Sequence, residues 1–301
     1  MQEKLYGFLK AQDVEIFENY PLSEMSSVGI GGAALVLRPK SLRGLVATVS
    51  ALSEWGIEYK TVGRASNVLP PDDGYGKAVV CTTAIRGFRR EGDILMAECG
   101  ASFRRIALEL SPLGLGGYEE LVGIPGSVGG MVAMNAGAYG RCVADFIEWA
   151  EVYLPRERKS VRVDASELDL SYRDSAVGRS RWILLSAAFR LQRSSTDRIN
   201  RRLKELSSLR RASQPLEYPS LGSVFKRTSV GSAAKMIDEC GLKGLRCGGA
   251  QVSEKHAGFI INVGGATARD VLDLVEHIRT VIRKNYGVEL ECEVRRVGNG
   301  E

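Results

Sequence analysis

With 301 residues, of which 44% are hydrophobic and 26% charged, the chain has the composition of an ordinary globular protein. Its longest apolar runs are too short to cross a bilayer, and its N-terminus mixes charged with apolar residues, so we expect neither membrane span nor signal peptide. The net charge of +5 is modest and comes with no long basic block, which argues against nucleic-acid binding and is compatible with a small anionic substrate.

Cysteine and histidine usage narrows the chemistry further. The six cysteines lie far apart without a CxxC pair, so we expect reduced thiols in the cytoplasm rather than a disulfide framework or a zinc knuckle. Only two histidines are present, which is too few for a multi-histidine metal site. We therefore expect no metal, and proton transfer by groups other than histidine.

The first part of the chain alternates strand-like and helical patterns. A helix is predicted over Ser41–Trp55 from apolar residues at helical spacing, and Ser102 is placed to cap a helix whose inner face includes Phe103 and Leu110. Strands are predicted at Ala33–Leu37, Tyr59–Val62, Ala78–Cys81, Ile94–Glu98, Phe146–Leu154, Val161–Val163 and Trp182–Leu191. This order predicts an α+β fold with loops large enough to hold a nucleotide.

A change in composition at Arg193–Asp197 marks a domain boundary, with one domain over residues 1–195 (core about 29–194) and a smaller α+β domain over 196–301. The second domain is expected to begin with a basic amphipathic helix that ends before Gln214. It should continue with a strand at Gly222–Lys226, a helix at Ser232–Cys240, a strand at Gly258–Val263, a helix at Ala268–Tyr286 and a last strand at Val288–Val294.

Glycine-rich loops carry the strongest functional signal. The stretch Gly29-Ile-Gly-Gly-Ala-Ala34 fits the pattern GxGxxA. A dinucleotide-binding fingerprint should follow a strand and open a helix, whereas this stretch precedes a strand, so we do not interpret it as one. No P-loop motif is present. Gly63-Arg-Ala-Ser-Asn-Val-Leu69 follows a strand and offers N–H groups to a phosphate, although such a loop is often an ordinary turn. Between Gly123 and Gly140 there are six glycines in eighteen residues, which favours a ligand lying on bare main chain over a purely structural double turn.

These loops occur together with further motifs in a fixed order. The motifs are Asn19-Tyr-Pro-Leu-Ser23, Ile30-Gly-Gly-Ala33, Gly63–Asn67, Gly123-Ile-Pro-Gly-Ser-Val-Gly-Gly130, Ser171-Tyr-Arg-Asp-Ser175, Gly222-Ser-Val-Phe-Lys226 and Leu290-Glu-Cys-Glu-Val-Arg295. In this order the sequence resembles the UDP-N-acetylenolpyruvoylglucosamine reductases over about residues 16–297. The short span between Arg173 and Ser223 resembles the shorter, type II subclass, which lacks a tyrosine-bearing substrate loop.

The resemblance implies a two-part FAD-binding domain of the vanillyl-alcohol-oxidase (PCMH) type, followed by the smaller α+β substrate-binding domain. It implies a cytoplasmic, monomeric enzyme of peptidoglycan precursor synthesis that uses NADPH to reduce the enolpyruvyl ether of a UDP-sugar. In such enzymes flavin N5 passes hydride to the substrate β-carbon. With both histidines outside the first domain, non-covalent FAD is expected; attachment through Cys142 stays a formal alternative.

The resemblance also implies roles for the individual residues that match the family's motifs. The resemblance implies that Ser223 donates the proton, with Arg173 and Glu293 stabilising the enolate-like intermediate. The implied FAD-binding residues are Gly63, Arg64, Ala65, Ser66, Asn67, Gly123, Ile124, Pro125, Gly126, Ser127, Gly130, Asn135, Gly137 and Ala138. The implied substrate-binding residues are Tyr172, Lys226 and Arg227.

Plainer interpretations of the charged residues stay open. Arg173 could pair with Asp174 on the surface, and Lys226 and Arg227 could form a solvated basic strand end. In a strand over Val288–Val294, alternation places three glutamates and Arg295 on one face, where crowding would raise the pKa of a buried carboxylate. The family pattern selects Glu293, and Glu291 is the competing choice.

The sequence also departs from the family pattern. Arg64 and Ala65 stand where a glycine or asparagine and then a glycine are usual, so a Cβ lies where main chain should approach a phosphate. Arg227-Thr228 replaces the usual Asn-Pro or Arg-Pro, which bears on contacts to the uridine. Two alternatives follow: a flavin oxidase of the same superfamily acting on another small alcohol or sugar, and a flavin-less nucleotide-binding relative.

Overall fold

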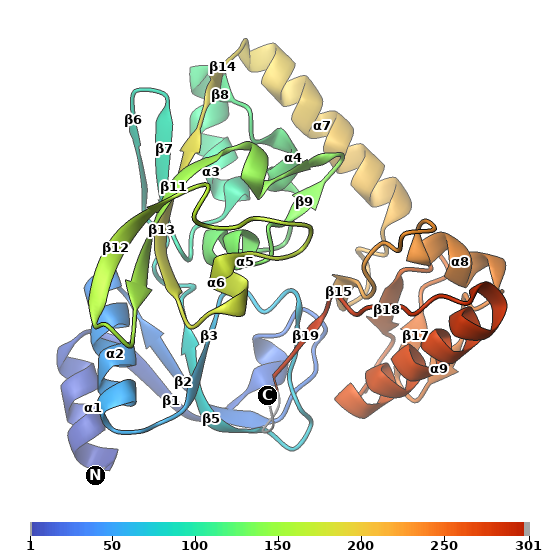
Figure 1. Cartoon of the computed structure of the whole chain (residues 1–301), viewed down its shortest axis with the longest axis horizontal. Helices are drawn as coiled ribbons and strands as arrows, with labels where there is room; N and C mark the ends of the chain where they lie inside the picture. Colours follow the sequence, from blue (N-terminus) through green and yellow to red (C-terminus); the bar gives the residue numbers. More distant parts are fainter. Residues whose placement is uncertain (1, 298–301) are drawn as a thin grey trace. The chain divides into compact units, whose positions relative to one another are not determined.

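The computed structural model describes residues 2–297 and divides the chain into two compact units (Figure 1). Unit 1 consists of Met1–Glu18, Val36–Arg64 and Lys77–Leu209, and unit 2 of Asn19–Leu35, Ala65–Gly76 and Arg210–Glu301. Two short pieces of the first half of the sequence therefore belong to the same unit as the C-terminal third. The predicted domain boundary after residue 195 falls just before helix α7 and stays a prediction.

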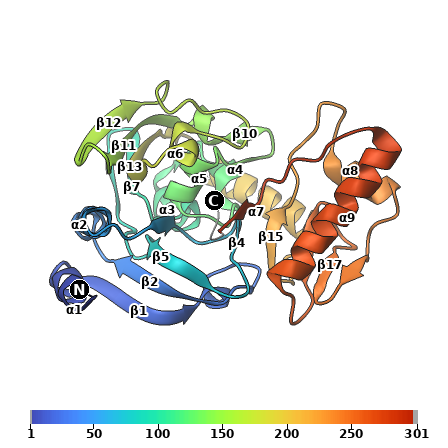
Figure 2. The same cartoon turned by 60° about the horizontal axis from the view of Figure 1, so that its bottom comes forward.

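Unit 1 is built on two sheets. In the first, of order β1-β2-β5-β3, strands β3 and β5 run parallel, and β1, β2 and β5 each cross into unit 2 at one end. Helices α1 and α2 lie beside this sheet in both views (Figures 1 and 2). The elements are α1 Gln2–Ala11, β1 Val14–Pro21, β2 Ala33–Pro39, α2 Leu42–Glu54, β3 Tyr59–Val62 and β5 Tyr75–Cys81.

The second sheet of unit 1 has the order β12-β11-β13-β7-β6 and is antiparallel throughout. Its strands are β6 Phe88–Glu91, β7 Ile94–Glu98, β11 Ile147–Leu154, β12 Lys159–Asp164 and β13 Ile183–Arg190. The helices of this region are α3 Phe103–Leu110, α4 Glu119–Val122, α5 Val128–Ala133, α6 Ala176–Arg179 and α7 Thr196–Ser213. Short pairs β8 Leu115–Gly116 with β14 Gln192–Arg193, and β9 Gly137–Ala138 with β10 Arg141–Cys142, complete it.

Unit 2 has an antiparallel sheet of order β15-β18-β17-β16, on which helix α9 packs. Its elements are η1 Leu22–Glu24, β4 Val68–Leu69, β15 Ser220–Ser223, α8 Ala233–Glu239, β16 Arg246–Cys247, β17 Ala250–Val252, β18 Phe259–Asn262, α9 Ala268–Tyr286 and β19 Arg295–Arg296. The side chain of Thr267 caps α9 together with Asp270, and Gly287 ends it in the left-handed conformation with φ 67°.

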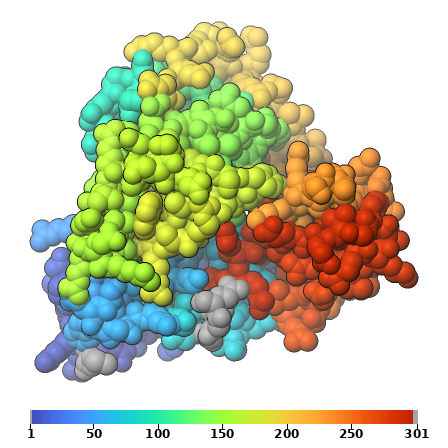
Figure 3. Space-filling view, in the orientation of Figure 1, coloured from blue at the N-terminus to red at the C-terminus, as the bar shows by residue number. Residues whose placement is uncertain are grey.

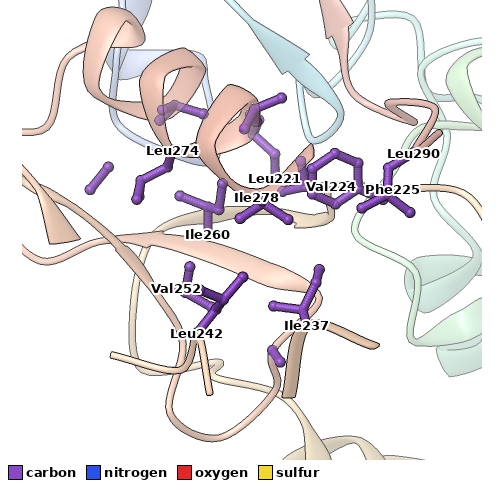
Figure 4. Close-up of a cluster of buried hydrophobic side chains, with 14 of the residues drawn as sticks. Leu221, Val224, Phe225, Ile237, Leu242, Val252, Ile260, Leu274, Ile278 and Leu290 are labelled. Carbon is purple, nitrogen blue, oxygen red and sulfur yellow. The ribbon is translucent and has the colours of Figure 1, made fainter. Parts of the chain in front are cut away.

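Unit 2 has one large cluster of buried hydrophobic side chains, and Figure 4 shows part of it. Val28, Ile30 and Leu69 from the first half pack in the same cluster as the C-terminal residues. Leu221, Val224, Phe225 and Leu290 are also buried members. The residues that flank Ser223 and the C-terminal glutamates are thus anchored in one core, which restrains both segments.

Most predicted elements are present. The ranges Tyr59–Val62, Ile94–Glu98 and Ala268–Tyr286 match the structure residue for residue, and Ser102 caps α3 by accepting a hydrogen bond from the Arg105 N–H at 3.4 Å. The stretch Ile30–Gly32 precedes β2, as expected. A Cβ on Gly32 would stand 2.4 Å from the Asp72 carbonyl oxygen, so this glycine has a packing role.

Two predicted strands are wrong in part. The strand expected at Gly222–Lys226 ends at Ser223, and beyond it Phe225 forms only an isolated bridge with Cys292. In place of the strand expected at Val288–Val294, the structure has this isolated bridge at Cys292, and the short strand β19, which runs parallel to β4, begins at Arg295. Along that segment a side chain takes the place of a strand partner, since the Arg279 Nε donates to the Leu290 carbonyl oxygen at 3.0 Å.

Candidate active site in two parts

The residues selected from the sequence fall into two groups, one in each unit, and each is described by itself. The glycine-rich cluster of unit 1 comprises Gly63–Arg64, residues 123–140 and Ser171–Ser175. The Ser223 cluster of unit 2 comprises Ala65–Asn67, residues 222–227 and residues 289–295. The chain passes from unit 1 to unit 2 between Arg64 and Ala65, inside the first predicted phosphate loop.

In unit 1, the two predicted cofactor loops meet at Gly63 and Ser127. A Cβ on Gly63 would lie only 2.1 Å from the Ser127 Oγ, so no other residue fits there without displacing that hydroxyl. Ser127 is 1% exposed, and its Oγ has no hydrogen-bond partner within residues 2–297. Buried hydroxyls are normally paired, so an unpartnered one is unusual and is compatible with an acceptor such as a phosphate oxygen. Contact of the two loops with the nucleotide part of FAD stays a prediction.

Not every glycine of the 123–140 stretch is kept for a ligand. A Cβ on Gly137 would meet the Arg141 carbonyl oxygen at 2.5 Å, and one on Gly129 would meet the Cys99 carbonyl oxygen at 3.2 Å. Gly130 has more space, with its nearest neighbour, the Ser127 Oγ, at 3.7 Å. Some glycines of the stretch therefore have a packing role, others leave room, and a ligand on this main chain stays a prediction.

The side chain of Asn135 is used by the protein itself. It is 5% exposed, its Nδ2 donates to the Ser171 carbonyl oxygen at 2.7 Å, and its Oδ1 accepts from the Ala144 N–H at 3.0 Å. Its φ of 38° places the backbone in the left-handed region that asparagine tolerates. Asn135 therefore ties the glycine-rich stretch to the Ser171–Ser175 turn, and a contact with FAD stays a prediction for it.

The Ser171–Ser175 turn presents Tyr172 and Arg173 at its tip. Ser171 and Asp174 exchange main-chain hydrogen bonds of 3.1 and 3.2 Å, and Arg173 has φ 58°. The Arg173 Nη2 donates to the Gly137 carbonyl oxygen at 3.1 Å, while its guanidinium lies 5.1 Å from the Tyr172 ring centre. Residues of the surrounding segment, lime to yellow-green, lie on the visible face of unit 1 (Figure 3), and Tyr172 is 50% exposed.

Two contacts here bear on the alternatives for Arg173. Asp174 forms an ion pair with Arg179. Arg173 also donates to the main chain of the glycine-rich stretch, which places its charge beside one of the predicted cofactor loops. A guanidinium held by a carbonyl is well suited to stabilise negative charge.

Ser175 is a residue that the sequence reasoning missed. It is fully buried, donates from Oγ to the Ala133 carbonyl oxygen at 2.9 Å, and caps α6 by accepting from the Gly178 N–H at 3.0 Å. Gly178 packs tightly too, since a Cβ there would lie 2.4 Å from the same carbonyl oxygen. The spacing of a serine three residues before a glycine at a helix start was the available signal.

In unit 2, Ser223 lies at a break in strand pairing. Gly222 has φ 78°, and the register between β15 and β18 shifts between Ser220 and Ser223. Such bulges bend the strand and redirect the side chain that follows. Ser223 is half-buried, whereas the next two residues are buried in the unit 2 core.

Glu293 lies on the segment beside Ser223. Its N–H donates to the Val224 carbonyl oxygen at 2.8 Å, and the Lys226 N–H donates to the Glu291 carbonyl oxygen at 2.9 Å. Two of the three residues with predicted catalytic roles, Ser223 and Glu293, are thereby brought onto adjacent segments of one unit. Arg173 belongs to unit 1.

The carboxylate crowding expected from alternation is corrected by the structure. Glu289 forms an ion pair with Arg283, whose hydrogen bond and charge lower the pKa of that carboxyl from its usual value. Glu291 forms an ion pair with Lys226 and has a 71% exposed side chain. Both carboxylates are engaged by cations near solvent, which makes Glu291 a weaker choice than the half-buried Glu293 for work at a protected site.

His256 is a hydrogen-bonded structural histidine, as expected. Its Nδ1 accepts from the Gly258 N–H at 3.1 Å, and its ring packs edge-on against Phe259. Burial lowers its pKa from the usual 6.5. No cluster of three metal-ligating side chains and no helix suited to span a membrane occurs within the part of the chain that the structure describes.

Comparison with known proteins gives the family. The chain is 41% identical to UDP-N-acetylenolpyruvoylglucosamine reductase from Caldicellulosiruptor bescii, covering 98% of this chain and 94% of that protein. The enzyme of the same name from Pseudothermotoga lettingae is also 41% identical, covering 93% of this chain and 97% of the relative. The chain belongs to the UDP-N-acetylenolpyruvoylglucosamine reductase family.

Family models and a solved structure agree with this assignment. Residues 214–297 match the C-terminal domain of UDP-N-acetylenolpyruvoylglucosamine reductase, and residues 33–159 match an FAD binding domain. The crystal structure of the reductase from Thermus caldophilus superposes with a TM-score of 0.81 at 30% identity, covering 95% of this chain and 100% of that one. The expected fold, a vanillyl-alcohol-oxidase-type FAD domain with the reductase C-terminal domain, is confirmed, and the chain is an FAD-dependent oxidoreductase.

Proposed function

We propose that the chain reduces UDP-N-acetylglucosamine enolpyruvate to UDP-N-acetylmuramate with NADPH, in peptidoglycan precursor synthesis. Relatives named for this reductase activity match nearly the whole chain. The observation that carries the proposal furthest is local: Ser223 follows a strand bulge and lies beside the segment of Glu293. A monomeric enzyme in the cytoplasm is part of the same proposal.

FAD would be held without a covalent bond by the loops around Gly63 and Ser127, where the buried Ser127 hydroxyl can donate to a phosphate. When bound, FAD supplies hydride that originates from NADPH and is delivered from N5 to the substrate β-carbon. The other FAD-binding residues proposed from the family pattern are Arg64, Ala65, Ser66, Asn67, Gly123, Ile124, Pro125, Gly126, Gly130, Asn135, Gly137 and Ala138.

Ser223 would donate the proton to the substrate α-carbon. A serine hydroxyl is a weak acid, so it can act only on a strongly basic carbon, such as that of an enolate-like intermediate. Arg173 would place a permanent positive charge beside the developing negative charge, and Glu293 would polarise the same intermediate by donating a hydrogen bond from its protonated carboxyl group. None of these steps requires a histidine.

Tyr172, Lys226 and Arg227 would bind the UDP-sugar. Lys226 is already in an ion pair with the exposed Glu291. A diphosphate carries more charge than one carboxylate, so it would compete well for this ammonium group. Arg227 is exposed and is followed by Thr228 rather than proline, which leaves this loop a less rigid backbone than the family pattern has.

The test follows the flavin absorbance of Ser223→Ala through two separate half-reactions, which are reduction of the flavin by NADPH and its re-oxidation by the enolpyruvyl UDP-sugar. Ser220→Ala, on the same strand, is the control. NADPH should bleach both variants at about the wild-type rate. Re-oxidation by the enolpyruvyl UDP-sugar should slow at least about a hundredfold in Ser223→Ala, the usual scale for loss of a general acid, and stay near wild type in Ser220→Ala. Normal re-oxidation of Ser223→Ala would remove this serine from the mechanism.

A further inference from the structure

The side chain of Asn67 makes a contact that its place in a phosphate loop does not explain. Its Nδ2 donates to the main-chain carbonyl oxygen of Glu293 at 3.0 Å, across 226 positions of sequence. The Asn67 carbonyl oxygen in turn accepts from the Arg295 N–H at 2.9 Å, where β4 and β19 begin to pair. All of these residues belong to unit 2.

Both main-chain polar groups of Glu293 are therefore fixed. On one side the Asn67 amide holds its carbonyl oxygen, and on the other the Val224 carbonyl accepts its N–H at 2.8 Å. Val224 is the buried neighbour of Ser223 and anchors that end of β15 in the core. The position of Glu293 relative to Ser223 thus depends on a three-segment junction in which Asn67 supplies the side-chain contact.

The same loop also reaches the other end of β15. The Ala65 carbonyl oxygen accepts from the Ser27 N–H at 3.4 Å, and the Ser27 Oγ donates to the Ser220 carbonyl oxygen at 2.6 Å. Residues 65–67 are consequently tied to both ends of the strand that carries Ser223. A change in this loop would be transmitted to Ser223 and Glu293 together.

We propose that Asn67 is a positioning residue for Glu293, in addition to being part of the cofactor loop. The inference rests on the proposed function, because it assigns Glu293 its role in stabilising the intermediate. A donor is required at this position, since the group that it meets is a carbonyl oxygen. Aspartate has nearly the same shape as asparagine but, when ionised, can only accept. Asn67→Asp therefore removes the contact and changes little volume.

The chain offers a matched control in Asn285 on α9. Its Nδ2 also donates to a main-chain carbonyl oxygen, that of Val281 at 2.9 Å, and it is exposed and lies outside both clusters. Asn285→Asp makes the same chemical change to the same kind of hydrogen bond. It should leave both half-reactions unchanged.

The experiment measures both half-reactions at saturating FAD for wild type, Asn67→Asp, Asn285→Asp, Glu293→Gln and the double variant Asn67→Asp with Glu293→Gln. Asn67→Asp should be bleached by NADPH within about twofold of wild type. Its re-oxidation by the enolpyruvyl UDP-sugar should slow about tenfold to a hundredfold, the scale of a misplacement of about 1 Å. In the Glu293→Gln background, Asn67→Asp should slow re-oxidation by less than about a further twofold. Asn67 is proposed to act through Glu293, so its effect should largely disappear once that glutamate is replaced.

A second readout uses the protein without cofactor. Amide hydrogen exchange of Glu293 and Arg295 should accelerate in Asn67→Asp apoprotein and not in Asn285→Asp, because the junction loosens only in the former. The proposal is overturned if Asn67→Asp weakens FAD binding but re-oxidises at the wild-type rate once saturated. It is equally overturned if the effects of Asn67→Asp and Glu293→Gln multiply. Failure of wild type to be re-oxidised by the enolpyruvyl UDP-sugar would instead contradict the proposed function.

Discussion

Ala65 has a backbone conformation that favours glycine. Its φ is 47°, and its methyl group is buried, with 6% of the residue exposed. A left-handed alanine costs about 1 kcal/mol or more, whereas burial of one methyl group contributes about 0.8 kcal/mol. A glycine would adopt this backbone conformation without strain, whereas the alanine keeps it at a small net cost.

We expect Ala65→Gly to bind FAD several-fold more tightly, because the variant removes a Cβ from a loop in which main chain should approach phosphate. The melting temperature of the apoprotein should change little, since relief of strain and loss of the buried methyl nearly cancel. FAD titration followed by fluorescence, together with thermal unfolding, measures both quantities.

Ala51→Gly is the control for this prediction. Ala51 lies in α2, is equally buried, and has no positive φ. Glycine there should lower the melting temperature, at a cost of about 1 kcal/mol from helix propensity alone, and leave FAD affinity unchanged. Unchanged or weaker FAD binding by Ala65→Gly would show that the Cβ does not obstruct the cofactor.

At the scale of elements, long regular patterns were predicted well and short contextual ones were not. The helix Ala268–Tyr286 matches because its apolar period, its Thr267 cap and its terminal Gly287 all agree. The segment Val288–Val294 alternates like a strand but pairs with main chain only around Cys292, because the side chains of Arg279 and Asn67 occupy the carbonyl groups of Leu290 and Glu293. Such partners lie far away in sequence, so local periodicity could not reveal them.

In the candidate site too, local motifs could be recognised in the sequence and long-range contacts could not. Ser223, Glu293 and Arg173 were selected by motif, and the structure brings the first two onto adjacent segments. What the sequence could not give was the supporting set of contacts. These include the buried hydroxyl of Ser127 against Gly63 and the role of Ser175, which depend on three-dimensional packing.

The end of α9 allows a direct test of element-level reasoning. Gly287 has φ 67° and open space where a Cβ would lie, so Gly287→Ala introduces backbone strain and no clash. It should destabilise the protein by about 1 kcal/mol. Gly7 also has open space but lies inside α1 without a positive φ, so Gly7→Ala should stabilise by up to about 1 kcal/mol. Thermal unfolding of both variants should give shifts of opposite sign, and shifts of equal sign would contradict the argument.

At the scale of the whole molecule, unit 2 is assembled from three separated stretches of chain. The segments Asn19–Leu35 and Ala65–Gly76 join the C-terminal part, with the buried Val28, Ile30 and Leu69 in its core. Asp72 also accepts hydrogen bonds from the Ala268 and Arg269 N–H groups at the start of α9, at 2.6 and 3.1 Å. The C-terminal third therefore depends on the first half of the sequence for its core and its helix capping.

We propose that this chain binds FAD and uses it to pass reducing equivalents from NADPH to an enolpyruvyl UDP-sugar. The most direct test is an anaerobic absorbance measurement of the FAD-loaded protein. NADPH should bleach the flavin band, and UDP-N-acetylglucosamine enolpyruvate should restore it with one UDP-N-acetylmuramate formed per flavin. A flavin that NADPH does not bleach, or that oxygen re-oxidises but the enolpyruvyl sugar does not, would contradict the account.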